Sequence, residues 1–295
     1  MFSHHPARAW RVDPHARSRG PLLAALGVAL ATVGCAPPGP RSTERDVQTF
    51  RRSVAVAGLR QGAGAVVNVS YLQSGDALGP RVILVHGTPG SASGWADYVL
   101  QPPAGLEMLA IDRPGFGDSG PVGAMTTLAD QAAAVAALLP DDGRPVVLLG
   151  HSLGGPVVAR VALDHPGRVQ AVVLLAASMD PALEKIQPVQ WVGAWPGLRW
   201  ALPRAIRNAN AELMALKSEL VALAAQLQYI RVRVVIVHGT ADDLVPFANV
   251  AFMQARLTAA RCVKTLVLEG RNHFLPWNSA DVVRAAINQA LEPAC

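Results

Sequence analysis

The sequence predicts an α/β protein with a mostly parallel central sheet and helices on both faces. From Val54 onward, short runs of β-branched and aliphatic residues alternate with longer amphipathic stretches, which is the pattern of strands joined by crossing helices. The composition agrees, because 51% of the 295 residues are hydrophobic and only 16% are charged. Such a chain can bury a large core, which argues against a disordered or fibrous protein.

Six runs have the composition of buried strands, since they are nearly continuous in apolar residues. Helical spacing is found in three longer stretches, and each lies where it can cross back over the sheet. The order of these segments favours one large domain over two. The strands are expected at 81–85, 108–111, 145–149, 171–175, 232–237 and 263–268, and the helices at 127–139, 154–163 and 280–291.

Residues 180–230 interrupt this alternation. They contain no strand signal, are rich in Ala and Leu, and carry Trp191, Trp195 and Trp200 among three prolines. We expect a small helical cap inserted on top of the sheet. Its tryptophans either line an apolar substrate pocket or only pack the cap onto the sheet.

The first 34 residues have the pattern of an export signal. A polar segment with four arginines precedes an apolar run from Pro21 to Gly34, which is too short to span a bilayer comfortably. Residues 32–35, Thr-Val-Gly-Cys, resemble the bacterial lipoprotein box. This resemblance implies that Cys35 is lipidated after cleavage and anchors the protein to a membrane of the cell envelope. A secreted protein without a lipid and a cytoplasmic leader are the alternatives.

The chain is therefore interpreted as a signal peptide at 1–34, a tether at 35–52 and a folded domain at 53–295. The start of the tether has linker composition, because it is rich in proline and poor in apolar residues. Three of the five net positive charges fall in the signal. The domain carries no basic stripe interleaved with aromatic residues, which argues against a nucleic-acid partner.

Two cysteines remain in the domain, Cys262 and Cys295. An oxidising compartment can join such an even pair. Cys262 opens the last predicted strand, and Cys295 follows a helix that should return antiparallel to that strand. Both are then expected near the start of the strand, which predicts a disulfide; two unrelated cysteines are the alternative.

The segment Gly150-His-Ser-Leu-Gly154 follows a predicted strand and opens a predicted helix, which is the context that gives a G-x-S-x-G motif its chemical meaning. Ser152 is expected on a tight turn, where the small Gly150 and Gly154 relieve crowding. The N-terminus of the following helix favours negative charge that develops nearby. We predict that Ser152 is a nucleophile.

A serine hydroxyl becomes a strong nucleophile only when a base takes its proton and an acid orients that base. His273 lies between the last predicted strand and the last helix, after the serine and the acid in chain order, which is where this chemistry places its base. The acid is expected in the loop after 232–237, which holds Asp242 and Asp243. In a tight turn only one of the two can face His273.

Five motifs occur in the order seen in the α/β-hydrolase fold-1 family, and by them the chain is identified as a member. This resemblance implies the α/β-hydrolase fold. It also favours Asp242 as the acid, because the spacing Gly-x-x-Asp-x-x-Val-Pro is similar to the acid loop of the family; Asp243 is the alternative. Asn272 departs from the family pattern, which often has a second glycine before the histidine. The motifs are His86–Gly90, Asp112–Ser119, Gly150–Gly154, Gly239–Pro246 and Asn272–Phe274.

The resemblance further implies an oxyanion hole built from the backbone N–H groups of Thr88 and Leu153. The side chain of His86 is expected to have no direct chemical role. The loop at 112–119 is expected to be structural, with Asp118 bonding backbone amides rather than substrate.

Together these residues predict a serine hydrolase that cleaves a carboxylic ester or a related acyl bond through an acyl-enzyme. The expected partner is a small molecule with an apolar acyl group, and no cofactor or metal is implied. A serine at this turn disfavours the family's dehalogenase and epoxide hydrolase activities, which use an aspartate. Hydrolysis of a carbon–carbon bond or a lactone, acyl transfer to an alcohol, and ligand binding without catalysis stay open, because one fold carries many functions.

Overall fold

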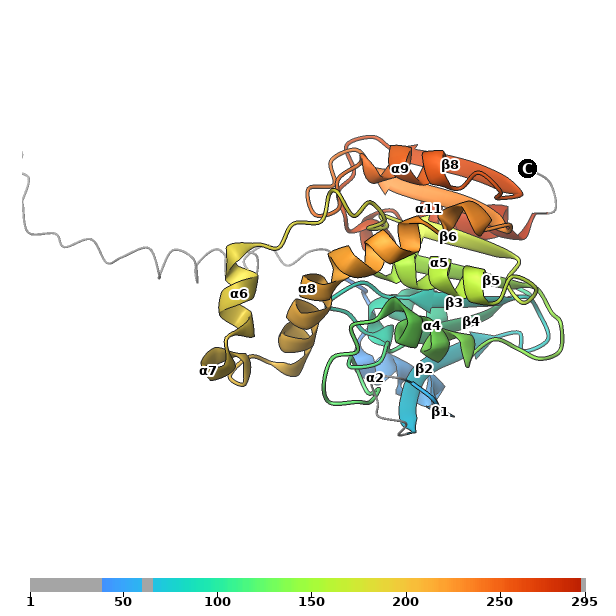
Figure 1. Cartoon of the computed structure of the whole chain (residues 1–295). Helices are drawn as coiled ribbons and strands as arrows, with labels where there is room; N and C mark the ends of the chain where they lie inside the picture. Colours follow the sequence, from blue (N-terminus) through green and yellow to red (C-terminus); the bar gives the residue numbers. More distant parts are fainter. Residues whose placement is uncertain (1–38, 60–65, 293–295) are drawn as a thin grey trace, which may run out of the picture. The chain divides into compact units, whose positions relative to one another are not determined.

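Eight strands form a single sheet in this computed structural model, in the order β1-β2-β4-β3-β5-β6-β7-β8 (Figure 1). The structure describes residues 39–59 and 66–292. The strand β2 pairs antiparallel with β1 and β4, and the six strands from β4 to β8 in this order are parallel. The strands are β1 (Arg51–Val56), β2 (Val67–Gly75), β3 (Arg81–Val85), β4 (Glu107–Ile111), β5 (Val146–His151), β6 (Ala171–Leu175), β7 (Arg233–Gly239) and β8 (Cys262–Leu268).

The predicted α/β class with a mostly parallel sheet is confirmed. All six predicted strands exist, and β3 and β6 have the predicted bounds. The strands β1 and β2 were not predicted. Only the last residue of β1 is buried, and β2 mixes buried with partly exposed residues and contains asparagine, serine and glutamine. Neither strand therefore has the continuous apolar run of a buried parallel strand.

Helices connect the parallel strands and cover the sheet. The helix α11 has its predicted bounds, and α4 and α5 are within three residues of theirs at each end. The cap region 180–230 contains helices and no strand. The helices are α2 (Glu44–Val47), α3 (Ala96–Leu100), α4 (Leu128–Ala136), α5 (Gly154–Asp164), α6 (Pro188–Ala194), α7 (Pro196–Arg199), α8 (Arg204–Ala224), α9 (Asn249–Arg256), α10 (Leu275–Asn278) and α11 (Ala280–Leu291), with short 3-10 turns at Gln48–Phe50, Ala92–Trp95 and Leu227–Tyr229.

Two apolar clusters make up the core, one on each face of the sheet. Successive strand residues point to opposite faces, so Ile83 and Val85 join one cluster while Val82 and Leu84 join the other. The first cluster packs under α4, α5, α8 and α9, and the second under α3 and α11. Figure 1 shows α4 and α5 side by side on the near face of the sheet. The buried faces explain why the parallel strands are apolar throughout.

The ordered part of the chain begins before residue 53, which corrects the predicted extent of the tether. The helix α2 and the start of β1 both lie inside 35–52. The carboxylate of Asp97 accepts hydrogen bonds from the backbone of Arg41 and Ser42, at 2.9 and 3.0 Å. Val47 is fully buried in the core. These contacts order a segment whose composition alone resembles a linker.

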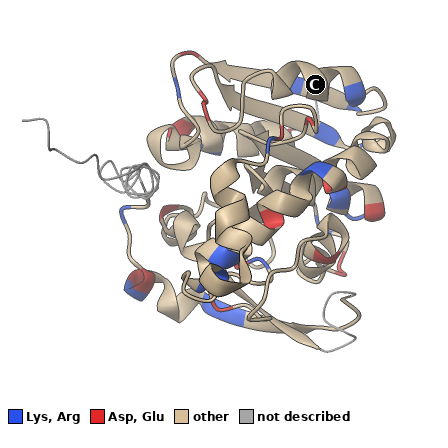
Figure 2. Ribbon diagram, turned by 60° about the vertical axis from the view of Figure 1, so that its left-hand side comes forward, with Lys and Arg blue, Asp and Glu red and all other residues tan. Residues whose placement is uncertain are grey.

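The chain divides into two units, 1–37 and 38–295, and every element named above belongs to the second. This second unit contains both core clusters, so it carries its own fold. No helix in the described ranges is long and apolar enough to cross a membrane. Acidic and basic residues are interspersed over the ribbon in the view of Figure 2. The predicted signal peptide, Cys35 and Cys295 lie outside the described residues. Cys262 is disulfide-bonded, and the identity of its partner as Cys295 stays a prediction.

Candidate active site

The carboxyl ends of β3 and β5 lie side by side at the point where the strand order reverses. The chain runs from β3 outward to β4, and then returns to place β5 on the other side of β3. Val85 pairs with Gly150, so the loops that follow both strands meet. Such a switch point opens a crevice in an α/β sheet and is where ligands bind.

Ser152 occupies a strained turn between β5 and α5. Its φ of 56° lies in the left-handed region, which is uncommon for a residue with a side chain. The turn is held by two backbone hydrogen bonds, from Ser152 N to the Leu175 carbonyl (3.0 Å) and from Gly155 N to the Ser152 carbonyl (2.9 Å). A Cβ atom at Gly150 or Gly154 would collide with neighbouring backbone. The two glycines therefore relieve crowding as the sequence predicted.

His273 and Asp242 form a buried pair beyond the ends of β7 and β8. The His273 Nδ1 donates to the Asp242 Oδ2 at 2.7 Å, and both residues are almost inaccessible to solvent. The other carboxylate oxygen of Asp242 accepts backbone hydrogen bonds from Leu244 (3.0 Å) and Val245 (2.8 Å). Asp243 is exposed. Of the two neighbouring acids, the structure thus places Asp242 against the histidine.

Backbone contacts bring the acid loop and the histidine loop together. Ala241 N donates to the Arg271 carbonyl at 3.0 Å, and Gly270 N donates to the Thr240 hydroxyl at 2.9 Å. Asn272, which stands where the family often has glycine, uses its side-chain oxygen to accept from Phe274 N (3.2 Å) and from Asn278 Nδ2 (2.6 Å). The asparagine therefore holds the turn through its side chain.

The proton on His273 Nδ1 leaves its Nε2 as a hydrogen-bond acceptor. In the described part of the chain no hydrogen bond joins this Nε2 to Ser152; the hydrogen bonds of His273 involve its Nδ1 and its carbonyl. Catalytic hydrogen bonds of this kind often form only in the complex with substrate. His151, the chain neighbour of Ser152, contacts the histidine loop, since the centre of its ring lies 4.7 Å from that of the His273 ring.

His151 positions the backbone of His273, a role that the sequence did not reveal. Its Nε2 donates to the His273 carbonyl at 3.0 Å, and its ring packs edge-on against Trp95 and Trp277. Burial, reinforced by the nearby His273, lowers the pKa of His151 to about 3. His151 is therefore neutral at physiological pH, and a neutral ring suits this apolar site.

His238 is a second histidine at the acid loop. Its Nε2 donates to the Val245 carbonyl at 2.9 Å and lies 3.5 Å from the Asp242 Oδ2. Burial lowers its pKa. A neutral His238 supports the shape of the loop and leaves the charge of Asp242 facing His273.

Acid sensitivity is expected from His151. Its folded pKa of about 3 lies below the 6.5 of an unperturbed histidine, so the unfolded chain takes up a proton first as pH falls below 6.5. The stability that the neutral His151 contributes to the folded protein is complete above pH 6.5. It is lost as the pH falls toward 3, by at most about 1.4 kcal/mol per pH unit. The variant His151→Gln keeps an N–H donor but does not titrate. We measure the unfolding free energy in urea at pH 7 and at pH 5. The decrease between these two values should be about 2 kcal/mol smaller for His151→Gln than for the wild type. If the unfolding free energies of the variant and the wild type decreased equally with pH, the role given to His151 would be contradicted.

The loop after β3 lies against the serine turn. A Cβ atom at Gly87 would come within 2.7 Å of the Ser152 Cβ, so only glycine allows this approach. The backbone N–H groups of Thr88 and Leu153 donate to no other group within the described ranges. The Thr88 hydroxyl is buried and also has no partner there. These donors remain available for a group that enters the site.

A buried arginine ties this loop to the cap. Arg113 Nε donates to the His86 carbonyl and its Nη2 to the Gly87 carbonyl, both at 2.9 Å. The same guanidinium binds Glu212 of α8, with 2.6 Å between Nη1 and Oε1. Gln131 donates to Glu212 as well, at 2.9 Å. Arg113 lies inside a sequence motif, but no sequence signal distinguished Glu212 from other residues of a cap helix.

The His86 side chain is hydrogen-bonded within the loops that surround the serine turn. Its Nε2 accepts the backbone N–H of Arg113 at 3.0 Å, which leaves Nδ1 to donate to the Gly87 carbonyl at 2.6 Å. Burial, reinforced by the charge of Arg113, lowers the pKa of His86 well below its ordinary value. The neutral ring therefore braces the loop that carries Thr88.

The prediction for Asp118 was wrong in detail. Its carboxylate is exposed and pairs with Arg51, with 3.1 Å between Nε and Oδ2. The acid that bonds backbone amides in this loop is Asp112, which accepts from Ala92 N (2.6 Å) and Asp118 N (3.2 Å). Burial raises the pKa of Asp112, while these hydrogen bonds oppose the rise. Burial, which sequence alone does not reveal, decided between the two acids.

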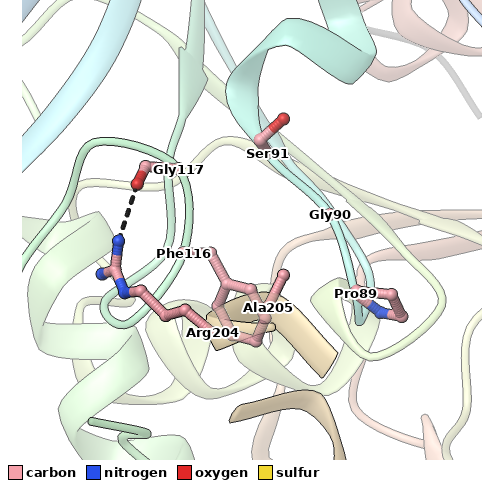
Figure 3. Close-up of a pocket in the computed structure, with 7 residues that line it drawn as sticks. All are labelled: Pro89, Gly90, Ser91, Phe116, Gly117, Arg204 and Ala205. Atoms are coloured by element: carbon pink, nitrogen blue, oxygen red, sulfur yellow. Dashed lines mark hydrogen bonds between the residues drawn. The ribbon is translucent and has the colours of Figure 1, made fainter. Parts of the chain in front are cut away.

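A pocket of about 500 Å³ lies next to the Thr88 loop (Figure 3). Its volume is in the range of small-molecule sites. Ser152 and His273 are not among its lining residues, so this pocket does not contain the serine turn. Arg204 of α8 closes one side by donating to the Gly117 carbonyl at 2.9 Å. The lining residues are Pro89, Gly90, Ser91, Phe116, Gly117, Arg204 and Ala205.

Known proteins are similar to this chain in sequence and in fold. The chain is 28% identical over 238 residues to pimeloyl-(acyl-carrier protein) methyl ester esterase of Aeromonas hydrophila, which covers 66% of this chain and 89% of that protein. It is 37% identical over 112 residues to the dihydrolipoyllysine-residue acetyltransferase component of the acetoin cleaving system of Cupriavidus necator. That match covers 37% of this chain and spans only 29% of that relative.

A solved hydrolase from Pseudomonas aeruginosa has a similar fold, with a TM-score of 0.62 and 20% sequence identity. The superposition covers 81% of this chain and 98% of the other. Residues 82–286, which include Ser152, Asp242 and His273, match the alpha/beta hydrolase family. This match spans more than half of the chain, and the protein therefore belongs to the alpha/beta hydrolase family.

Proposed function

We propose that this hydrolase uses Ser152 as a nucleophile to cleave a carboxylic ester or a related acyl bond through an acyl-enzyme. One observation carries the proposal. His273 is held by Asp242 at 2.7 Å in the tautomer that accepts a proton at Nε2, at the same edge of the sheet as the left-handed turn of Ser152. A histidine fixed in this way can serve as a general base.

The chemistry then proceeds in two steps. His273 accepts the Ser152 proton as the serine oxygen attacks the acyl carbonyl, and returns that proton to the leaving group as the bond to it breaks. A water that loses its proton to His273 next attacks the acyl-enzyme, and the acid product leaves as Ser152 regains a proton. Asp242 stabilises the positive charge that His273 carries during both steps.

The backbone N–H groups of Thr88 and Leu153 would form the oxyanion hole. Each tetrahedral intermediate carries a negative oxygen, and preorganised donors stabilise it more than they stabilise the neutral carbonyl. Both N–H groups lack a protein partner in the described part of the chain. The N-terminus of α5 adds a favourable dipole at the same place.

An ester is the preferred substrate class because the relative from Aeromonas hydrophila is named as a methyl ester esterase and the match covers most of its length. Acyl transfer is a second candidate, supported by the shorter match to an acetyltransferase component. The two differ in whether an added alcohol or thiol outcompetes water for the acyl-enzyme. Product analysis in the presence of such an acceptor would distinguish them.

Export and anchoring belong to the same proposal. The predicted signal at 1–34 would place the enzyme in the cell envelope, and lipidation of Cys35 would hold it on a membrane surface. An oxidising compartment would also favour the disulfide between Cys262 and Cys295. These residues, Cys262 excepted, lie outside the described ranges, so the support comes from the sequence pattern.

A fluorophosphonate probe tests the nucleophile. Purified protein of residues 36–295 should gain one probe mass in an intact mass spectrum, because an activated serine attacks the phosphorus. Ser152→Ala should abolish this gain and His273→Ala should reduce it severely. Ser91→Ala is the matched control, since Ser91 lines the neighbouring pocket, and it should label like the wild type. Absence of labelling in folded wild-type protein would favour a ligand-binding protein instead.

A further inference from the structure

The outer surface of the cap exposes an unusual set of large apolar side chains. We call these five residues, all on or next to α6 and α7, the outer cap face. Each of them has more than half of its surface in contact with solvent, and Trp200 reaches 70%. Exposed large apolar side chains gathered within a dozen residues of the chain point to an interaction site rather than to a requirement of the fold. The five residues are Val189, Trp191, Val192, Trp195 and Trp200.

The fold itself makes little use of these side chains. The helices α6 and α7 contain no buried residue. In Figure 1 both lie beside the amino-terminal half of α8, and α6 packs on α8 by its other side, where Asn210 donates to the Gln190 carbonyl at 2.9 Å. The tryptophans are therefore not required to attach the cap to the sheet.

Basic residues outnumber acidic ones around this face. Residues 184–211 contain one lysine and three arginines against one acidic residue, Glu184, whose carboxylate accepts from the Ser178 hydroxyl. Arg199 and Arg207 lie against the ring of Trp200, at 4.8 and 5.3 Å from its centroid, so cationic and aromatic groups share one surface. Lys185 and Arg199 are exposed. The partner of this face must therefore accept aromatic rings and carry negative charge.

We propose that the outer cap face docks on a membrane surface that contains anionic lipids. Tryptophan prefers the boundary between headgroups and acyl chains, where its ring is buried and its N–H stays hydrated. Lysine and arginine beside it pair with lipid phosphates. A second copy of this chain is a poorer occupant, because two copies would bring like charges together.

This docking goes beyond the proposed reaction and does not depend on it. It would nevertheless orient the enzyme toward apolar substrates. A pocket of about 360 Å³ adjoins this face at Trp200, between cap residues that include Arg199 and Arg207 and the loop at 122–124. A lipid-borne acyl group could enter the cap from the bilayer at this point.

Vesicle binding tests the proposal with protein of residues 36–295, which lacks the predicted signal and Cys35. Vesicles of phosphatidylcholine alone are compared with an equimolar mixture containing phosphatidylglycerol. The triple variant W191S/W195S/W200S should lower the partition coefficient by at least ~10-fold on both vesicles, since it removes the apolar contact. The double variant Lys185→Gln with Arg199→Gln should lower it by ~25-fold on anionic vesicles only, at about 1 kcal/mol per basic residue. Tryptophan emission of the wild type should shift to the blue on binding.

Matched controls change equally exposed residues elsewhere. Leu78→Ser with Tyr229→Ser removes exposed apolar groups, and Arg231→Gln with Arg261→Gln removes two exposed charges. Both should bind anionic vesicles like the wild type. Failure of the wild type to bind, or equal loss in the controls, would overturn the proposal. So would a wild-type dimer that the tryptophan variant converts to a monomer without changing vesicle binding, because the occupant would then be a second copy.

Discussion

Ser152→Ala is expected to lower kcat for an activated ester by about 10⁶-fold, the loss found when a serine hydrolase is deprived of its nucleophile. The rate that remains would come from the oxyanion hole and substrate binding alone. His273→Ala should cost about as much, and the double variant should lose little more than either single one, because the two residues act as a unit. Initial rates on p-nitrophenyl esters of increasing acyl length measure this.

Asp242→Asn distinguishes the two neighbouring acids. An asparagine can donate to His273 Nδ1, which would leave the proton on Nε2 and remove the base; the expected loss in kcat is about 10⁴-fold. Asp243→Asn is the control, because Asp243 is exposed, and its rate should stay within about twofold of the wild type. The reverse ranking would mean that the acid is Asp243. Full activity of Ser152→Ala would refute the acyl-enzyme mechanism.

Glu212→Ala is expected to have the largest effect on stability. Both partners of the Arg113–Glu212 ion pair are buried, and removing one leaves a charge without its counterion in the interior. Loss of one partner of such a pair costs about 3–5 kcal/mol of unfolding free energy. Activity should fall too, because Arg113 also holds the carbonyls of His86 and Gly87, next to the loop that carries Thr88.

A surface ion pair provides the comparison for Glu212. Arg160 and Asp164 lie four positions apart on α5, with 2.8 Å between Nε and Oδ2, but both side chains are partly exposed. Asp164→Ala should therefore cost less than about 1 kcal/mol. Urea unfolding of both variants measures the difference. Equal losses would mean that the burial of Glu212 contributes nothing, and that the link between cap and core is weaker than its geometry indicates.

The buried parallel strands were predictable because burial on both faces demands continuous apolar residues. The runs that became β3 and β6 have the predicted bounds, and α11 was found from its helical spacing. The edge strand β1 and its neighbour β2 were not predictable in this way. Their residues face solvent in part, so the chain could place polar residues there and no apolar run marked them.

The sequence by itself determined the kind of chemistry that the site could carry. A serine between two glycines after an apolar strand, an acid loop and a late histidine, in that order, predict a nucleophile and its base. Local spacing suffices to recognise this motif, because the two glycines, the strand before them and the helix after them are all adjacent to Ser152 in the chain.

Only the tertiary structure decided which groups surround that chemistry. The contact of His151 with the His273 carbonyl joins residues 122 positions apart, and the pair of Arg113 with Glu212 joins residues 99 positions apart. No local pattern encodes such pairs, because each partner is ordinary in its own segment. Burial chose between Asp112 and Asp118 and between Asp242 and Asp243, since a carboxylate taken out of water must find hydrogen bonds or a counter-charge inside the fold.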